Sequence, residues 1–184
     1  MDRRIKKTET AILNATLALL EKTPITELSI KEICNYANVS RSTFYLHYLN
    51  PTDIIEQLFN NVCSSLTKTL DNFDFSTVLT NPKAFLRDIM YTVDIYIEQL
   101  TQLLKTNYHS NFRRRLKKVL EDKILKDNAY RYVERDQFVY SVNFIMSGLV
   151  ESMCDNLQDL QDEKKRVLFT DTLTKQIANG FKIN

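Results

Sequence analysis

Residues 28–48 read LSIKEICNYANVSRSTFYLHY and contain the clearest structural signals in the chain. Ser29 is a favourable N-cap, and Glu32, three residues later, completes the pattern of a capping box. An apolar face follows at helical spacing, made by Ile30, Ile33, Cys34 and Ala37. These features predict a helix that begins at Ser29.

A tight turn, Ala37-Asn38-Val39-Ser40, ends this helix. Such a turn needs one residue with left-handed backbone angles, and Asn38 is the usual substitute where glycine is absent. Val39 is placed to fill the angle between two helices, and Ser40 to cap a third helix from Arg41 to about His47. The pattern is typical of a helix-turn-helix, whose second helix enters the DNA major groove.

The surface of this third helix suits contact with nucleic acid. Phe44 and Tyr48 are spaced to anchor it inward, whereas hydroxyl groups, a guanidinium and an imidazole crowd the other positions. Such groups reach base edges and phosphates. The alternative is that the Ser/Thr/Tyr cluster is only a capped, solvated helix start. The predicted DNA-contacting residues are Ser29, Ser40, Arg41, Ser42, Thr43, Tyr45, Leu46 and His47.

The segment before residue 28 is basic and amphipathic. Thr8 to Lys22 has apolar residues at three- and four-residue steps, which predicts a helix, and Pro24 bars its continuation. Residues 1–50 carry seven basic and five acidic groups, so the chain's formal net charge of +2 arises there. Four cations in the first seven residues form a basic arm suited to phosphates. The alternative is a frayed, solvated terminus.

Composition favours a helical protein. The 184 residues are 43% hydrophobic and 26% charged, with two glycines and three prolines. Sheet-rich folds use more glycine and proline in their turns, so an all-α fold is predicted. Neither glycine has another nearby, which excludes a glycine-rich phosphate loop.

Catalytic and metal sites are not indicated. The two histidines and the scattered Cys34, Cys63 and Cys154 form no nucleophilic or metal-ligating pattern, so we expect no enzyme, metal or cofactor. Three unpaired cysteines suggest reduced thiols in the cytoplasm. No apolar run approaches the roughly 18–20 residues that span a bilayer, so no membrane partner is expected.

Residues 28–48 resemble the DNA-binding signature of the TetR/AcrR family of transcriptional regulators, and the resemblance extends over about residues 8–60. It implies a homodimer whose paired third helices read double-stranded DNA at a pseudo-palindromic operator. It also implies that Arg41, Ser42, Thr43, Tyr45 and His47 contact bases or phosphates, and Ser29 a phosphate. The C-terminal region also resembles, diffusely, regulators of dihydroxyacetone kinase operons.

Two positions depart from the family's pattern. Asn38 stands where glycine is frequent, and Pro51 stands where many members have a lysine that contacts a phosphate. Asn50 and Pro51 still form a good N-cap and first helical residue, so the helix start is retained. The phosphate contact that the lysine makes in those members is lost at Pro51.

The predicted domains are 1–50, which reads DNA, and 51–184, a helical ligand-binding and dimerisation domain. A helix is expected from Pro51 to about Asn72, with a linker at 71–82. Further helices are expected at 82–104, 109–126, 135–157 and 162–181. Within them the run Arg113-Arg114-Arg115-Leu-Lys117-Lys118 reads as a solvated face paired with Glu121 and Asp122, or as a second nucleic-acid patch.

An effector pocket is implied by the family resemblance, and aromatic residues with a few polar groups are typical of its lining. Any one of these residues can equally be plain core. If the set is only core, the domain either binds a partner protein or does no more than dimerise the DNA-reading domains. The candidates are Tyr91, Tyr108, His109, Phe112, Tyr140, Asn143 and Phe144.

The last two helices carry apolar stripes that suit a dimer interface. Gly148 and Gly180 fall in these helices, where glycine costs about 1 kcal/mol relative to alanine unless close helix approach offsets it. The alternative is packing within one subunit. The interface candidates are Val142, Ile145, Leu149, Met153, Phe169, Leu173 and Ile177. The sequence therefore predicts a homodimeric repressor controlled by a small-molecule effector or, alternatively, by a partner protein.

Overall fold

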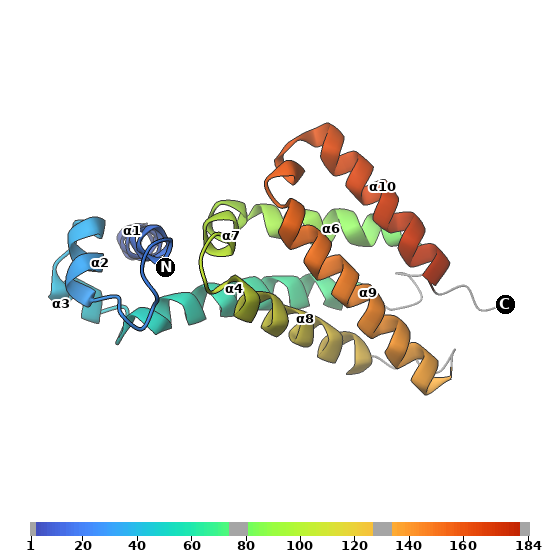
Figure 1. The fold of residues 1–184 in the computed structure, drawn as a ribbon, viewed down its shortest axis with the longest axis horizontal. Coiled ribbons are helices and arrows are strands. Elements are labelled where there is room, and N and C mark those ends of the chain that lie inside the picture. Colours follow the sequence, from blue (N-terminus) through green and yellow to red (C-terminus); the bar gives the residue numbers. More distant parts are fainter. Residues whose placement is uncertain (1–2, 74–80, 127–133, 181–184) are drawn as a thin grey trace. The chain divides into compact units, whose positions relative to one another are not determined.

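The computed structural model describes residues 3–73, 81–126 and 134–180, and every element in these ranges is helical (Figure 1). This confirms the predicted all-α class. The elements are α1 (Arg3–Leu20), α2 (Ile30–Ala37), α3 (Arg41–Tyr45), α4 (Pro51–Asp71), α6 (Pro82–Asp94), α7 (Ile97–Leu104), α8 (His109–Lys126), α9 (Arg135–Asn156), the 3-10 helix η2 (Asp159–Gln161) and α10 (Glu163–Gly180).

The chain divides into two compact units. The first contains the residues up to Asn61 together with Glu98–Ser110, and the second contains Val62–Ile97 together with the chain from Asn111 onward. The predicted functional division at residue 50 stays a prediction.

In the first unit, α1, α2 and α3 close around one small apolar core. Its buried residues come from all three helices and the start of α4, and Phe44 and Ile33 are fully inaccessible to solvent. Leu13, Leu19, Ile30, Ala37 and Val39 pack against it as partly buried neighbours. The core is formed by Ile12, Ala15, Ile33, Cys34, Phe44, Tyr48 and Ile54.

The first helix is longer than predicted. It begins at Arg3 instead of Thr8, so the first cations belong to the helix and not to an arm that precedes it. Thr8 Oγ1 donates to the carbonyl of Arg4 at 3.1 Å, and Thr10 Oγ1 donates to that of Lys6 at 2.9 Å. These hydroxyls bond back into the helix and do not cap its start, which is why Thr8 is a misleading start signal.

The α4 helix starts as predicted. Asn50 Oδ1 accepts from the Asp53 N–H at 3.1 Å, and Asp53 Oδ2 accepts from the N–H groups of Leu49 at 2.9 Å and Asn50 at 3.2 Å. This reciprocal bonding supports the N-cap at Asn50 and proline at the first helical position. The predicted apolar face of α4 is buried, from Ile54 to Leu70.

The helix predicted at 82–104 is in fact two helices, α6 and α7, separated at Ile95-Tyr96. The Tyr96 N–H donates to the Val93 carbonyl, three residues back, at 2.9 Å. The Tyr96 hydroxyl lies 2.8 Å from Ser65 Oγ on α4. A tertiary contact therefore accompanies the break, and no proline or glycine marks it in the sequence.

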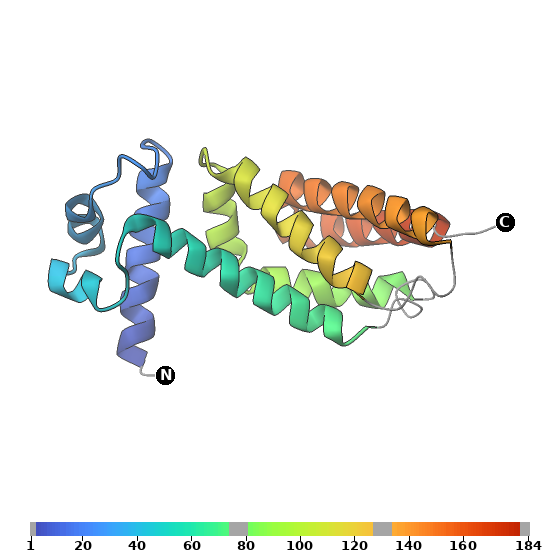
Figure 2. The same cartoon turned by 90° about the horizontal axis from the view of Figure 1, so that it is seen from below.

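The second unit packs α10 against α6, η2 and α9, and α9 and α10 lie side by side (Figure 2). The predicted helices at 109–126 and 135–157 match α8 and α9, and α10 matches 162–181 apart from its ends. The predicted break at Asp127-Asn128 and most of the predicted linker at 71–82 lie outside the described residues.

Candidate functional site

The N-terminus of α2 is fixed by a complete capping box. The Glu32 N–H donates to Ser29 Oγ at 3.2 Å, and the Ser29 N–H donates to Glu32 Oε2 at 3.1 Å. The Ser29 hydroxyl also donates to this carboxylate at 2.6 Å. These hydrogen bonds lower the pKa of Glu32, so the cap is formed by a carboxylate at neutral pH.

The turn between α2 and α3 has the predicted left-handed residue. Asn38 has φ 54° and ψ 48°, and it is the only non-glycine residue with positive φ among those described. The Val39 N–H donates to the Cys34 carbonyl at 3.0 Å, which closes the end of α2. The angle between the two helices is therefore set by one backbone conformation.

Ser40 organises the start of α3. Its Oγ accepts from the Thr43 N–H at 3.0 Å, as predicted for an N-cap. The same oxygen lies 2.7 Å from Ser42 Oγ and 2.8 Å from Thr43 Oγ1. The three hydroxyl groups thus form one cluster at the N-terminal end of this helix.

The α3 helix presents one face to the core and another to solvent. Phe44 and Tyr48 are buried, and burial raises the pKa of Tyr48 to about 12, with a smaller contribution from the Glu9 carboxylate. Arg41 and Ser42 are exposed, as are Tyr45 (55%) and Leu46 (82%). These four predicted DNA-contacting residues are therefore free to meet a ligand, as are the exposed Ser29 and Ser40.

His47 lies in a different environment from these four residues. Its Nδ1 is 3.4 Å from Glu9 Oε1 on α1, and only 12% of its side chain is accessible. His47 therefore ties the end of α3 to α1. Glu9 was missed in the sequence because it lies 38 residues away and no local pattern pairs it with a histidine.

The basic run on α8 is only partly solvated. Arg113 Nη1 donates to Glu151 Oε2 and to Asp155 Oδ1, both at 2.6 Å, and joins α8 to α9. Arg114 and Lys118 are exposed, as expected for a solvated face. Lys117 pairs with Glu121 at 3.6 Å, which confirms the predicted helical pair.

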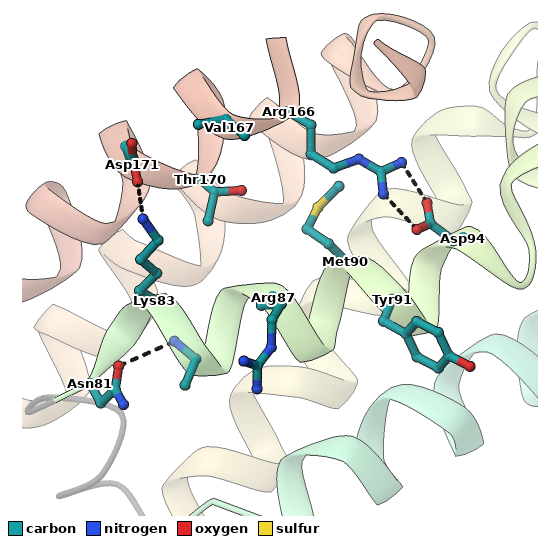
Figure 3. Close-up of a pocket in the computed structure, with 11 residues that line it drawn as sticks. Asn81, Lys83, Arg87, Met90, Tyr91, Asp94, Arg166, Val167, Thr170 and Asp171 are labelled. Carbon is teal, nitrogen blue, oxygen red and sulfur yellow. Dashed lines mark hydrogen bonds and ion pairs between the residues drawn. The ribbon is translucent and has the colours of Figure 1, made fainter. Parts of the chain in front are cut away.

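A surface pocket of about 540 Å³ lies between α6 and α10, within the second unit (Figure 3). Two ion pairs cross between these helices: Lys83 Nζ with Asp171 Oδ1 at 2.8 Å, and Arg166 with both oxygens of Asp94 at 2.7 and 2.8 Å. The remaining lining residues include Ala84, Arg87, Met90, Tyr91, Val167 and Thr170. The volume falls in the range of small-molecule sites.

The predicted ligand-binding residues are not gathered in this pocket. Tyr91 lines it, and Phe112 is buried in the core. Tyr140 and Phe144 are exposed on α9, at 70% and 81%, and Asn143 is exposed beside them. Tyr108 and His109 are half-buried and belong to the other unit; the Tyr108 hydroxyl donates to Glu56 Oε1 at 3.5 Å.

Most of the predicted interface residues are buried by packing within a single subunit. Ile145, Phe169 and Leu173 are half-buried. The larger exposed apolar residues of the last two helices are others: Tyr140 and Phe144 on α9, and Val167 and Leu168 on α10. The interface candidates that are buried are Val142, Leu149, Met153 and Ile177.

A comparison with known protein families finds a match for the helices near the N-terminus. Residues 12–58 match the family model described as "Bacterial regulatory proteins, tetR family". This part of the chain is therefore similar to the N-terminal domain of TetR-family proteins. The matched residues include α2, α3 and the turn between them, so the predicted resemblance is confirmed for this domain.

Two further proteins are similar. An "Uncharacterized HTH-type transcriptional regulator YxbF" of Bacillus subtilis (strain 168) is 29% identical over 86 residues, which is 46% of this chain, and the chain spans about a fifth (21%) of that relative's length. A crystal structure of a TetR transcriptional regulator from Streptococcus agalactiae 2603V has a similar fold. Its TM-score is 0.52 at 21% identity, over 94% of this chain and 96% of that one.

The matches bear on two other predictions, and the structure bears on the expected absence of membrane spans and metal sites. The link to dihydroxyacetone kinase operons is not supported by them. The matching family and relative are described as regulators and not as enzymes, in agreement with the predicted absence of catalysis. Within the described residues, no helix is long and apolar enough to cross a bilayer, and no group of His, Cys, Asp or Glu is placed to hold a metal ion.

Proposed function

We propose that this chain is a transcriptional repressor that binds a pseudo-palindromic operator as a homodimer and is controlled through residues 51–184. The observation that carries the proposal is the placement of α3 in a TetR-family domain. Phe44 and Tyr48 hold the helix against the core, while Arg41, Ser42, Tyr45 and Leu46 stay exposed. This is the geometry by which a recognition helix reads the major groove.

The other predicted contacts have distinct roles in the proposal. Ser29 and Ser40 are exposed hydroxyls that cap α2 and α3, and Thr43 is half-buried beside Ser40. In the proposal these three hydroxyls bond phosphates at the edges of the groove. His47 acts through Glu9 by holding α3 against α1. The cations at the start of α1, from Arg3 to Lys7, are exposed and add attraction to the DNA backbone.

Selection from a random duplex library at fixed salt tests DNA reading. We expect enrichment of a palindrome with half-sites about one helical turn apart. Tyr45→Ala should then weaken binding to that duplex by about 1–3 kcal/mol. Tyr91→Ala, which removes a more exposed tyrosine (72% against 55%) from the second unit, should leave the affinity unchanged when no effector is present. Absence of any enriched sequence would refute the proposal.

The dimer is proposed to form through an exposed stripe on α9. Tyr140, Phe144 and Gly148 follow one another at four-residue spacing, so they share a face. A Cβ added at Gly148 would meet nothing within 4 Å, so packing inside the chain does not explain this helical glycine. Close approach of a second copy does explain it.

Two substitutions test this interface by sedimentation equilibrium. Phe144→Asp should dissociate the dimer, whereas Asn143→Asp adds the same charge one residue away and should not. Gly148→Ala should weaken dimerisation, since the methyl group separates the helices. A Gly148→Ala variant that is stabilised by about 1 kcal/mol, with unchanged self-association, would show that this face is free.

The pocket between α6 and α10 supports the small-molecule alternative over the partner-protein one. Its apolar lining includes the buried Met90 and the exposed Val167, and two cations, Lys83 and Arg87, lie on the α6 side. Both cations have acidic partners, Asp171 and the adjacent Asp88, that are themselves solvent-accessible. The proposed effector is therefore an amphipathic anion, with an apolar body and one acidic group.

Thermal unfolding with sodium octanoate, and with 1-octanol as the neutral counterpart, tests this effector class. Octanoate should raise Tm more than octanol does, and Arg87→Gln should remove the difference. Equal shifts for the two compounds would show that charge is not recognised. No shift with either would favour a protein partner.

Whether the chain represses or activates is read from a reporter placed behind the selected operator.

A further inference from the structure

An exposed leucine lies at the C-terminal end of the proposed DNA-reading face. Leu46 is 82% accessible, the highest value among the large hydrophobic residues described. A single exposed leucine is ordinary on a protein surface, so its exposure alone indicates nothing. Its position relative to the buried residues of α3 is what gives it meaning.

The buried residues fix the direction in which Leu46 points. Successive helical residues are turned by about 100°. Ser42 and Leu46 each lie two residues from the buried Phe44, so both project from the side opposite to it. Tyr45 lies to one side of this face, with its ring edge against Phe44 at a centroid distance of 5.8 Å. Ser42 and Leu46 are therefore the pair that reaches deepest into a groove facing α3.

The chemistry of this pair is mostly apolar. The Ser42 hydroxyl is already bonded to Ser40 Oγ, so the hydroxyl cluster occupies the N-terminal half of the face. Leu46 is the C-cap residue of α3, and its apolar side chain lies in the C-terminal half of this face. In the major groove the C5-methyl of thymine is the apolar feature that distinguishes base pairs, whereas the other edges present donors and acceptors.

We infer that Leu46 packs against a thymine methyl group in each half-site and thereby selects thymine at one operator position. The inference rests on the proposed function and adds a base identity to it. A polar base edge opposite Leu46 would lose its water without gaining a hydrogen bond, which disfavours the other bases there. Leu46 is therefore a specificity residue, whereas the Arg41 guanidinium and the hydroxyls supply hydrogen bonds.

The test removes the methyl group alone. In the duplex enriched by the full chain, each thymine of the half-site is replaced symmetrically by deoxyuridine, and binding is measured at fixed salt. At one thymine position we expect the affinity to fall about three- to fivefold per half-site, as for loss of one buried apolar carbon. With Leu46→Ala, the same replacement should have no effect, because the leucine that contacts the methyl is gone.

Leu49→Ala is the matched control, since Leu49 is also exposed (76%) but lies beyond α3. It should keep the full deoxyuridine effect. If the selected duplex binds but no deoxyuridine weakens binding, or if the loss persists in Leu46→Ala, the inference is overturned while the proposed function stands. If no duplex is enriched at all, the proposed function itself fails, so the two failures are distinguishable.

Discussion

The helix-turn-helix of α1–α3 and the C-terminal unit of α6 and α8–α10 are held by hydrogen bonds of very different reach. In the helix-turn-helix and at the start of α4, the caps join residues three apart: Ser29 with Glu32, Ser40 with Thr43 and Asn50 with Asp53. In the C-terminal unit the ion pairs that join two α-helices connect residues 38 to 88 apart, such as Arg113 with Glu151, and Lys83 with Asp171. Short-range pairs, such as Lys117 with Glu121, occur there as well.

Because their hydrogen bonds differ in reach, the two regions depend on different contacts for their geometry. A short-range cap fixes one helix end whatever the rest of the chain does, so the angle between α2 and α3 is set locally. A long-range pair instead fixes one helix against another. It exists only once both are folded, and solvent screens it when its partners are exposed. We therefore expect the exposed surface of α3 to stay rigid and the proposed effector control to act on the long-range pairs.

The largest expected effect tests whether local caps or the small core hold the helix-turn-helix. Phe44→Ala removes a fully buried ring and should cost about 3–5 kcal/mol of unfolding free energy. Urea unfolding followed by circular dichroism measures this loss. Tyr45→Ala, next to it but exposed, should cost much less. A cost for Phe44→Ala below about 1 kcal/mol would show that the caps suffice without the core.

A second prediction concerns two thiols of the second unit, Cys63 on α4 and Cys154 on α9. Burial raises the pKa of Cys63 and of Cys154 from 9.0 to about 11, and Arg113 opposes the shift at Cys154. Between pH 9 and 11 the unfolded chain loses these protons and the folded chain keeps them. Stability is therefore fully present below pH 9 and falls as the pH rises to 11.

The expected loss over that interval is at most about 2 kcal/mol for each thiol, because two pKa units correspond to about 2.7 kcal/mol and the loss is not complete at pH 11. Urea unfolding at pH 8, 9, 10 and 11 measures it, and the Cys63→Ala/Cys154→Ala double variant controls for lysine and tyrosine titration. The double variant should show a flatter profile than the natural chain. Identical slopes would mean that both thiols ionise as readily in the folded state as in the unfolded one.

A third prediction compares neighbouring arginines on α8. Arg113 joins α9 through two carboxylates and is mostly shielded, whereas Arg114 is exposed and contacts only Asn111 among the bonds described. Arg113→Ala should cost about 1–2 kcal/mol, because the charge-assisted bonds are lost but the carboxylates remain half-exposed. Arg114→Ala should change the unfolding free energy by less than about 0.5 kcal/mol. Equal effects would mean that long-range pairing is not important to this unit.

The same contrast explains what could be predicted from the sequence. The capping box at Ser29, the left-handed Asn38 and the N-cap at Ser40 are properties of neighbouring residues, and the structure confirms each of them. The apolar face of α4 is likewise a local periodicity. The all-α class follows from the scarcity of glycine and proline.

Apart from the start of α1, the features that were missed depend on residues distant in sequence. The break at Ile95-Tyr96 comes with a hydrogen bond to Ser65, and His47 turns toward Glu9. The pocket is made by α6 and α10, whose lining residues are separated by most of the C-terminal unit. Aromatic composition could not locate it, because periodicity places a residue on a face of its helix and leaves the opposing helix undetermined.

The smallest expected effect concerns Asn38, whose left-handed backbone conformation forms the turn between α2 and α3. A left-handed backbone costs an ordinary L-residue roughly 1–2 kcal/mol, so Asn38→Ala should lower the unfolding free energy by about 1 kcal/mol. Asn38→Gly, which accepts φ 54° freely, should leave it within about 0.5 kcal/mol. If the angle between α2 and α3 is set locally, Asn38→Gly should also keep operator affinity. Loss of affinity in the glycine variant, with stability unchanged, would show that the asparagine side chain itself takes part in DNA binding.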